Sequence, residues 1–167
     1  MTKNEALQFL LDHQPLPPTR EISDALIQEF DKVRKLFALD LDERCVRPLL
    51  NSFGDGDGHG VYQLVEDTIL LYSEELVVSA LKDSLRNPSG SVRYWSALIA
   101  ANYLHRELVE PLFELFKEGN LDERIAVVIA LEGIGSREAQ EKLVAALSIK
   151  DIEDEVQSMI HEVLKAK

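Results

Sequence analysis

The sequence predicts an all-α chain of antiparallel helix pairs, on three observations. Apolar residues recur with helical spacing along most of the 167 residues. The connectors between these segments are short and rich in turn residues, as in "NPSG", "EGN" and "GIGS". No segment alternates apolar and polar residues for long enough to indicate a strand. A chain of this length is most simply one domain, residues 1–167, which buries its core without disulfides or structural metals.

A short helix is expected over about residues 4–13, within an N-terminal segment 1–14. The pattern Thr2-Lys3-Asn4-Glu5 is a capping box, in which two side chains satisfy free amides of the first helical turn. "QPLPPTR" then ends the helix. Its closely spaced prolines exclude helical backbone and favour an extended connector over residues 15–20.

The next segment, residues 21–38, has the periodicity of an amphipathic helix. Its apolar positions are three or four residues apart: Ile22, Leu26, Phe30, Val33 and Phe37. Another helix is expected over residues 42–52, with Pro48 as a weak point inside it. The glycine-rich loop, residues 54–60, follows.

Every segment after this loop again indicates helix, and residues 61–167 hold the clearest repeats. The expected helices are 61–72, 74–86, 91–105, 108–118, 122–134, 137–147 and 152–166. Aligning "SVRYWSALIAANYL" with "DERIAVVIALEGIG" places Arg93 on Arg124, and "DEVQSMIHEVL" brings Gln157 to the same position. The period is therefore about 32 residues. Because one helix pair cannot bury its own apolar face, such pairs stack on their neighbours and share a core.

These repeats resemble the HEAT-repeat family. The resemblance is carried by Val92-Arg93, Ala97, Ala100-Ala101, Arg124, Ala130-Leu131 and Gly133. The period is shorter than the roughly 40–47 residues usual for HEAT and armadillo units, and looks like that of a compact bacterial variety. The resemblance implies an α-solenoid of about four to five stacked antiparallel helix pairs. It also implies that Arg93 and Arg124 pair with acidic groups of the neighbouring repeat.

The tetratricopeptide repeat is the main alternative, since its period is similar. Its W-x2-L-G-x2-Y pattern is matched by Trp95 and Leu98, but Ile99 and Asn102 stand where the glycine and tyrosine belong. The pattern therefore favours HEAT-like stacking.

The composition indicates an acidic chain, with a formal net charge of −12 from 30 acidic and 18 basic residues. Such a surface repels nucleic acid and anionic lipid, and it attracts a basic protein. An acidic surface that only confers solubility is the alternative. No apolar run is long enough to span a membrane, and the single cysteine allows no internal disulfide, so we expect a cytoplasmic protein.

The glycine-rich loop "GDGDGHG" has the spacing of a calcium-binding EF-hand loop. Positions one, three, five, six and twelve of that loop would be Asp55, Asp57, His59, Gly60 and Glu66. Against calcium, His59 offers nitrogen rather than oxygen, Tyr62 stands where a small aliphatic residue usually packs, and no second loop is found. The favoured interpretation is a joint whose bare backbone displays Asp55, Asp57 and His59 to a protein partner. A purely structural turn is the alternative.

The sequence does not support an enzyme, and no cofactor is expected. Cys45 lies among apolar residues, where a packed thiol is the simplest interpretation. His161-Glu162 begins "HEVLK", which lacks the second histidine of the H-E-x-x-H zinc motif.

HEAT-like chains of this size also resemble certain bacterial immunity proteins. That resemblance implies a cytosolic inhibitor that neutralises a basic cognate toxin, such as a nuclease, by covering its active site with an acidic surface. The expected contacts are Asp55, Asp57, His59, Tyr62, Glu66 and Asp67. The alternative is a calcium-responsive or scaffold HEAT-repeat regulator, with calcium held by Asp55, Asp57 and Glu66.

Overall fold

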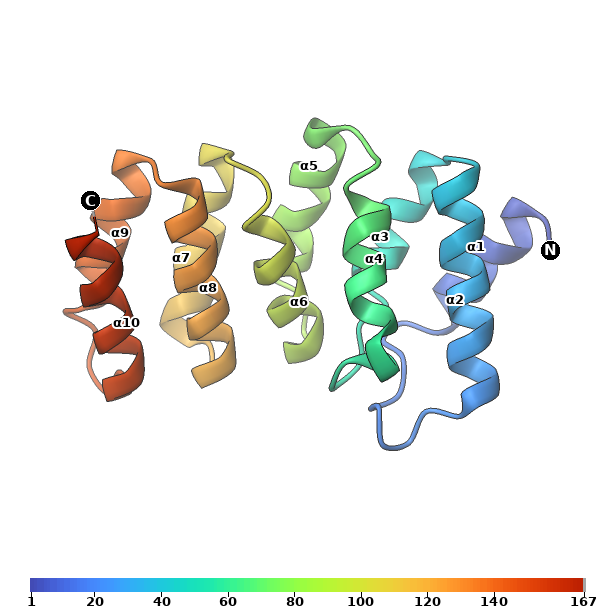
Figure 1. Ribbon diagram of the computed structural model, residues 1–167, viewed down its shortest axis with the longest axis horizontal. Helices are drawn as coiled ribbons and strands as arrows, with labels where there is room; N and C mark the ends of the chain where they lie inside the picture. Colours follow the sequence, from blue (N-terminus) through green and yellow to red (C-terminus); the bar gives the residue numbers. More distant parts are fainter. Residues whose placement is uncertain (167) are drawn as a thin grey trace. The chain divides into compact units, whose positions relative to one another are not determined.

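Ten α-helices and three short 3-10 turns make up the secondary structure of residues 1–166, the part of the chain that a computed structural model describes (Figure 1). The helices are α1 (Lys3–Asp12), α2 (Asp24–Leu39), α3 (Val46–Leu50), α4 (Val61–Ile69), α5 (Glu74–Ser84), α6 (Gly90–Ala100), α7 (Val109–Glu118), α8 (Leu121–Ile134), α9 (Arg137–Ala146) and α10 (Asp154–Lys165). No strand occurs in this range. The prediction of an all-α chain of HEAT-like helix pairs is confirmed.

Local capping explains where the helices begin. Thr2 and Glu5 form the predicted capping box of α1. Helix α2 begins at Asp24, three residues later than predicted, because the Ser23 hydroxyl accepts a hydrogen bond from the Leu26 amide. The helix predicted over 42–52 is instead a 3-10 turn followed by the five-residue α3. Pro48 lies in the first turn of α3, where its missing N–H leaves no helical bond unmade.

The described chain divides into two compact units, Met1–Ala80 and a second unit that begins at Leu81. The boundary falls within α5. The expectation of a single domain over 1–167 stays a prediction. None of the helices in residues 1–166 is long and apolar enough to cross a membrane.

The first unit is built on an aromatic core. Helix α2 packs against α1 and α4, and Phe30, Phe53 and Tyr62 are fully buried between them. The Tyr62 ring meets both phenylalanine rings edge-on, with centroids 6.4 and 5.3 Å away.

A buried tyrosine hydroxyl connects the end of α2 to the following 3-10 turn. Tyr72 donates to the Phe37 carbonyl oxygen at 2.9 Å. It accepts from the Asp42 amide at 3.4 Å and from the Cys45 thiol at 3.1 Å. Cys45 is fully buried, as the sequence predicted for a packed thiol, and burial raises its pKa to about 11.

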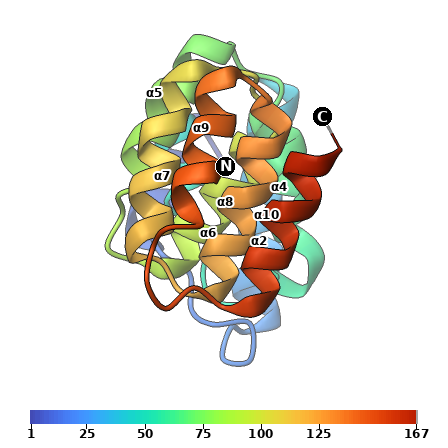
Figure 2. The same cartoon turned by 90° about the vertical axis from the view of Figure 1, so that its left-hand side faces the viewer.

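The second unit has two layers of helices. Helix α8 packs against α6 and α10 in one layer and against α7 and α9 in the other. Figure 2 shows α7 and α9 on one side of this unit and α8 and α10 on the other. Because α8 contacts helices on several sides, its sequence is apolar almost all round. Gly133 permits its close approach to α6, since an added Cβ would lie 2.9 Å from the Ala101 carbonyl oxygen.

Ion pairs join successive repeats in both layers of the second unit. In the first layer, Arg93 of α6 pairs with Glu123 of α8 at 2.8 Å. Arg124 of α8 pairs with Glu153, the N-cap residue of α10, at 3.0 Å. The predicted pairing of the two interior arginines with the neighbouring repeat is confirmed. The second layer is joined by Lys82–Glu107, Arg86–Glu114 and Glu110–Lys142.

Candidate protein-binding surfaces

The glycine-rich loop is fastened to the proline-rich connector. The Leu16 amide donates to the Ser52 carbonyl oxygen at 2.9 Å. Thr19 makes three further bonds: its amide and its hydroxyl donate to the Asp55 carbonyl oxygen at 2.7 and 3.0 Å, and its hydroxyl accepts from the Gly58 amide at 2.9 Å. Two segments almost forty residues apart in sequence are therefore one unit of local structure.

Three glycines of this loop are required by close packing. Gly54 and Gly58 are buried. A Cβ at Gly54 would lie 2.3 Å from the Leu16 carbonyl oxygen, and one at Gly58 would lie 2.5 Å from the ring of Tyr62. Gly56 has a φ of +94°, and its Cβ would meet the Thr19 hydroxyl at 2.4 Å. The expectation of a bare backbone is wrong at Gly54 and Gly58, which the connector and Tyr62 cover, whereas Gly56 and Gly60 are exposed.

The loop nevertheless displays its polar side chains. Asp55, Asp57 and His59 are exposed, as predicted. The Asp57 carboxylate accepts from the His59 amide at 3.0 Å and so caps the following turn. On α4, Asp67 is exposed and Glu66 is half-buried.

Tyr62 is the exception among the predicted contact residues. Its side chain is fully buried, and its hydroxyl accepts from the Gly54 amide at 2.9 Å. Desolvation of the phenol raises the pKa of Tyr62. The expectation that Tyr62 contacts a partner is therefore wrong, because its ring packs in the core and its hydroxyl is hydrogen-bonded to the loop.

The EF-hand spacing does not produce a metal centre. Within residues 1–166, no group of three or more histidine, cysteine, aspartate or glutamate side chains is placed to hold a metal ion. Asp55, Asp57 and Glu66 therefore do not converge. The Thr19 hydroxyl organises this turn, because it is hydrogen-bonded to the backbone carbonyl oxygen of Asp55 and to the backbone amide of Gly58.

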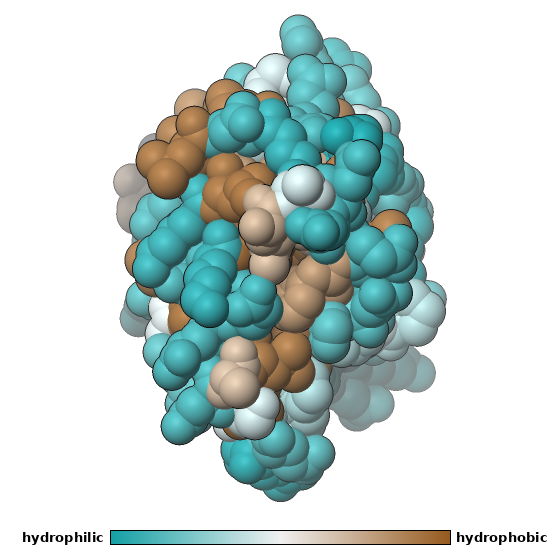
Figure 3. Space-filling view, turned by 90° about the vertical axis from the view of Figure 1, so that its right-hand side faces the viewer, coloured by the Kyte–Doolittle hydropathy of each residue, from teal (hydrophilic) through white to brown (hydrophobic). Residues whose placement is uncertain are grey.

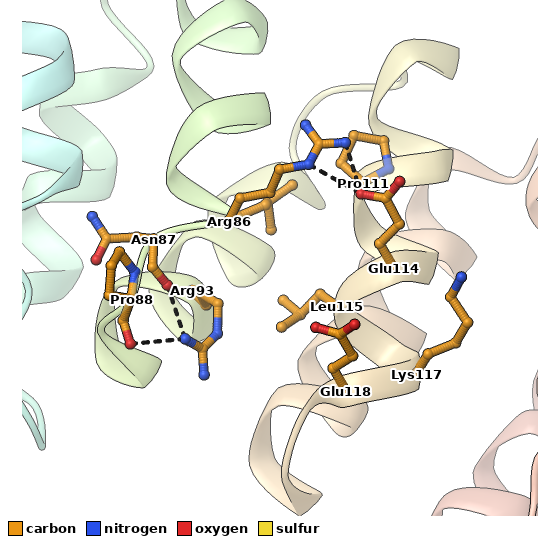
Figure 4. A pocket seen from close by; sticks show the side chains of 10 residues that line it. Arg86, Asn87, Pro88, Arg93, Pro111, Glu114, Leu115, Lys117 and Glu118 are labelled. Carbon is orange, nitrogen blue, oxygen red and sulfur yellow. Dashed lines mark hydrogen bonds and ion pairs between the residues drawn. The ribbon is translucent and has the colours of Figure 1, made fainter.

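A second candidate surface is a groove of about 580 Å³ in the second unit (Figure 4). It lies between α7 and the turn that connects α5 to α6. Its lining residues are Leu85, Arg86, Asn87, Pro88, Arg93, Pro111, Glu114, Leu115, Lys117 and Glu118. The lining thus combines leucine and proline side chains with charges of both signs.

Both arginines of the groove are held by partners inside the protein. Arg86 donates through Nε and Nη2 to Glu114 at 3.0 and 2.7 Å, and through Nη1 to the Lys82 carbonyl oxygen at 3.1 Å. Arg93 donates from Nη1 to the carbonyl oxygens of Asn87 and Pro88 at 2.8 and 3.0 Å, besides its pair with Glu123 (Figure 4). These hydrogen bonds therefore hold the two guanidinium groups, and the wall of the groove that they form, in place.

The first unit also carries an apolar edge. Leu39, the last residue of α2, is 89% exposed, and Leu41 is 51% exposed. Leu70 and Leu71, after α4, are 43% and 52% exposed. Figure 3 views the end of this unit that carries α1 and α2, where hydrophobic atoms gather in a few patches on a largely hydrophilic surface. Exposed apolar residues also occur in the second unit, where Leu104 is 72% exposed and Val144 is 55% exposed.

A family model described as HEAT repeats matches residues 78–165, which is more than half of the chain. The chain belongs to the HEAT-repeat family. The matched segment runs from within α5 through α10, and it contains the inter-repeat ion pairs and the groove. HEAT repeats mediate protein–protein interactions, so this chain is a protein-interaction or scaffold module. A comparison with curated proteins gives no match.

Sequence reasoning did not find the groove of this HEAT-repeat unit. Its lining comes from two separate segments, residues 85–93 and 111–118, and Pro88 in the "NPSG" turn was the only local signal. Which carboxylates face that turn depends on the rotation of α7 about its axis. That rotation is fixed by tertiary packing of its buried face.

Proposed function

We propose that this HEAT-repeat chain binds a basic protein and neutralises it, as an immunity or inhibitor protein would, by covering the active site of its partner with an acidic surface. Three observations support the proposal. The family mediates protein contacts, the net charge is −12, and the glycine-rich loop holds exposed carboxylates in a fixed place.

The acidity is concentrated in the first unit. Residues 1–80 contain 15 acidic and 7 basic side chains, whereas residues 81–167 contain 15 and 11. Complementary charge speeds the encounter with a basic partner and selects against acidic ones. The glycine-rich loop belongs to this more acidic unit.

The observation that carries the proposal is the loop itself. Asp55 and Asp57 are exposed, and within residues 1–166 neither carboxylate has a cation as partner. Their backbone is already ordered by Thr19 and Tyr62. A partner would therefore gain two carboxylate contacts without the entropic cost of ordering a flexible loop.

The test is capture of a partner from the lysate of the native organism, with this chain as bait and with washes at low and then high salt. We expect one basic protein to be retained at low salt and released at high salt, because salt screens exposed charge pairs. The double substitution Asp55→Ala with Asp57→Ala should weaken binding about 2- to 30-fold, since each exposed pair contributes about 0.2–1 kcal/mol.

A matched control removes two exposed carboxylates elsewhere. Asp154→Ala with Glu155→Ala, on α10, changes the net charge by the same amount and should leave the affinity nearly unchanged. Equal losses in both double variants would show that only net charge matters and would remove the role of the loop. A bait that retains no basic protein would contradict the proposal as a whole.

The activity of the captured protein decides between inhibition and scaffolding. An inhibitor should abolish its partner's activity at one-to-one stoichiometry, whereas a scaffold should leave it unchanged. Neutralisation that survives combined alanine substitution of Asp55, Asp57 and Glu66 would contradict the assignment of the loop as the contact surface.

A further inference from the structure

We infer that the groove between α7 and the α5–α6 turn receives one basic side chain of the partner, arginine or lysine, with the Glu118 carboxylate as its acceptor. The inference rests on the proposed function, because it assigns the occupant to a basic protein. It adds a second contact surface, in the unit that the family match covers.

The arginines of the groove do not make it a site for anions. Arg86 and Arg93 already donate to two carboxylates and to three backbone carbonyl oxygens. An anionic ligand would have to take Arg93 from Glu123, whose side chain is only 2% exposed. That exchange would leave the buried carboxylate without its cation, which is strongly unfavourable.

Glu118 is the carboxylate of the groove that remains available. Glu114 is paired with Arg86, whereas no cation pairs with Glu118 within residues 1–166. Figure 4 shows the Glu118 carboxylate beside Leu115 at the groove, with the Lys117 ammonium directed away from it. Lys117 instead lies over the Phe113 ring, 5.4 Å from its centroid.

The position of Glu118 on its helix strengthens its attraction for a cation. It is the last residue of α7, which ends at the C-cap residue Gly119. The free carbonyl groups at the C-terminal end of a helix carry partial negative charge, which favours a cation nearby. Glu118 therefore offers a carboxylate acceptor at the groove, although the lining contains three basic residues.

The remaining lining suits the stem of a basic side chain. Leu85, Pro88, Pro111 and Leu115 give the groove an apolar wall. Arginine and lysine carry three or four methylene groups, which pack along apolar surface while the charged head reaches a polar group. A volume of about 580 Å³ accommodates such a side chain together with part of the backbone that carries it.

The experiment is a titration of the ¹⁵N-labelled chain, followed by amide chemical shifts, with N-acetyl-arginine amide and, separately, N-acetyl-lysine amide. Two controls are N-acetyl-norleucine amide, which has the stem without the charge, and N-acetyl-glutamate amide. We expect saturable shifts at Asn87, Leu115 and Glu118 with the cationic amides only. The cationic amide that binds with the higher affinity identifies the preferred head group.

The variant Glu118→Gln should weaken binding of the cationic amide about two- to fivefold, which is the effect of one exposed charge pair. The matched control Glu138→Gln removes an exposed glutamate of α9 that does not line the groove and should change nothing. Unchanged binding in Glu118→Gln, equal shifts with norleucine amide, or binding of glutamate amide would each overturn the inference.

Failure of this inference differs from failure of the proposed function. If the basic amides produce no shifts at the groove while the bait still captures a basic protein, the groove assignment alone is wrong. If the amides bind at the groove but no basic protein is captured, the proposed function is wrong and the groove is a cation-selective pocket without that partner.

Discussion

Replacing Glu123 by alanine should destabilise the second unit strongly. The Glu123 side chain is only 2% exposed, and it accepts from Nε of Arg93 at 2.8 Å and from the Asn120 amide at 2.8 Å. It therefore joins α6 to α8 and completes the capping box at the start of α8. The substitution removes both interactions and leaves the guanidinium group of Arg93 without its carboxylate.

The expected loss is about 3 kcal/mol of unfolding free energy. Removing one partner of a buried pair costs about 3–5 kcal/mol, and the lost cap adds about 1 kcal/mol. The cost is reduced because the Arg93 side chain is 26% exposed and keeps its bonds to the Asn87 and Pro88 carbonyl oxygens. At about 2–4 °C for each kcal/mol in a chain of this size, Tm should fall by about 6–12 °C.

The matched control is the surface pair Arg137–Glu141, which has the same chemistry at 2.9 Å but side chains 92% and 63% exposed. Glu141→Ala should cost no more than about 0.5 kcal/mol. Urea unfolding followed by circular dichroism measures both variants. A double-mutant cycle of Arg93→Met and Glu123→Gln should give a coupling of about 1–3 kcal/mol. A coupling near zero, or equal losses for the two alanine variants, would contradict this prediction.

Three further predictions concern the first unit. Gly54→Ala should lower the free energy of unfolding by more than about 2 kcal/mol, since its Cβ would lie 2.3 Å from a backbone carbonyl oxygen. The Cβ of Gly60→Ala would meet no atom within 4 Å, so this variant should lose only the roughly 1–2 kcal/mol that a positive φ costs. Equal urea midpoints of the two variants would contradict this prediction. Cys45 is buried, and its pKa is raised to about 11. Its thiol should therefore resist iodoacetamide at pH 8 in the native chain and react fully in urea. Rapid labelling of the native chain would show that the thiol is accessible. Hydrogen bonds from Arg44 lower the pKa of Asp42 from 3.8 to about 2, so the carboxylate stabilises the fold above about pH 4 and this contribution is lost as pH falls toward 2. Asp42→Asn should therefore flatten the fall in stability over that range, and an unchanged acid-unfolding curve would show that Asp42 does not contribute.

Most of the helices and their stacking could be predicted from the sequence, because the signals for both are local or periodic. A capping box such as Thr2 with Glu5 satisfies backbone amides within its own helical turn, so it marks a helix start without any tertiary contact. The recurrence of Arg93 at Arg124 indicated stacked repeats, and stacking places each arginine beside the next repeat. The resemblance to HEAT repeats implied an acidic partner in the neighbouring repeat, and the structure shows that these partners are Glu123 and Glu153.

The roles of the irregular segments depend on tertiary contacts. The glycines at 54 and 58 could indicate a flexible joint, a cation loop or a packed turn, and the contacts of Thr19 and Tyr62 select the last. Tyr62 has the local sequence of a surface residue beside a loop, yet its ring fills the core. The groove likewise depends on which side of α7 faces a distant turn. Such contacts join residues far apart in the chain, so no local pattern specifies them, and they form only when the buried faces of the helices pack.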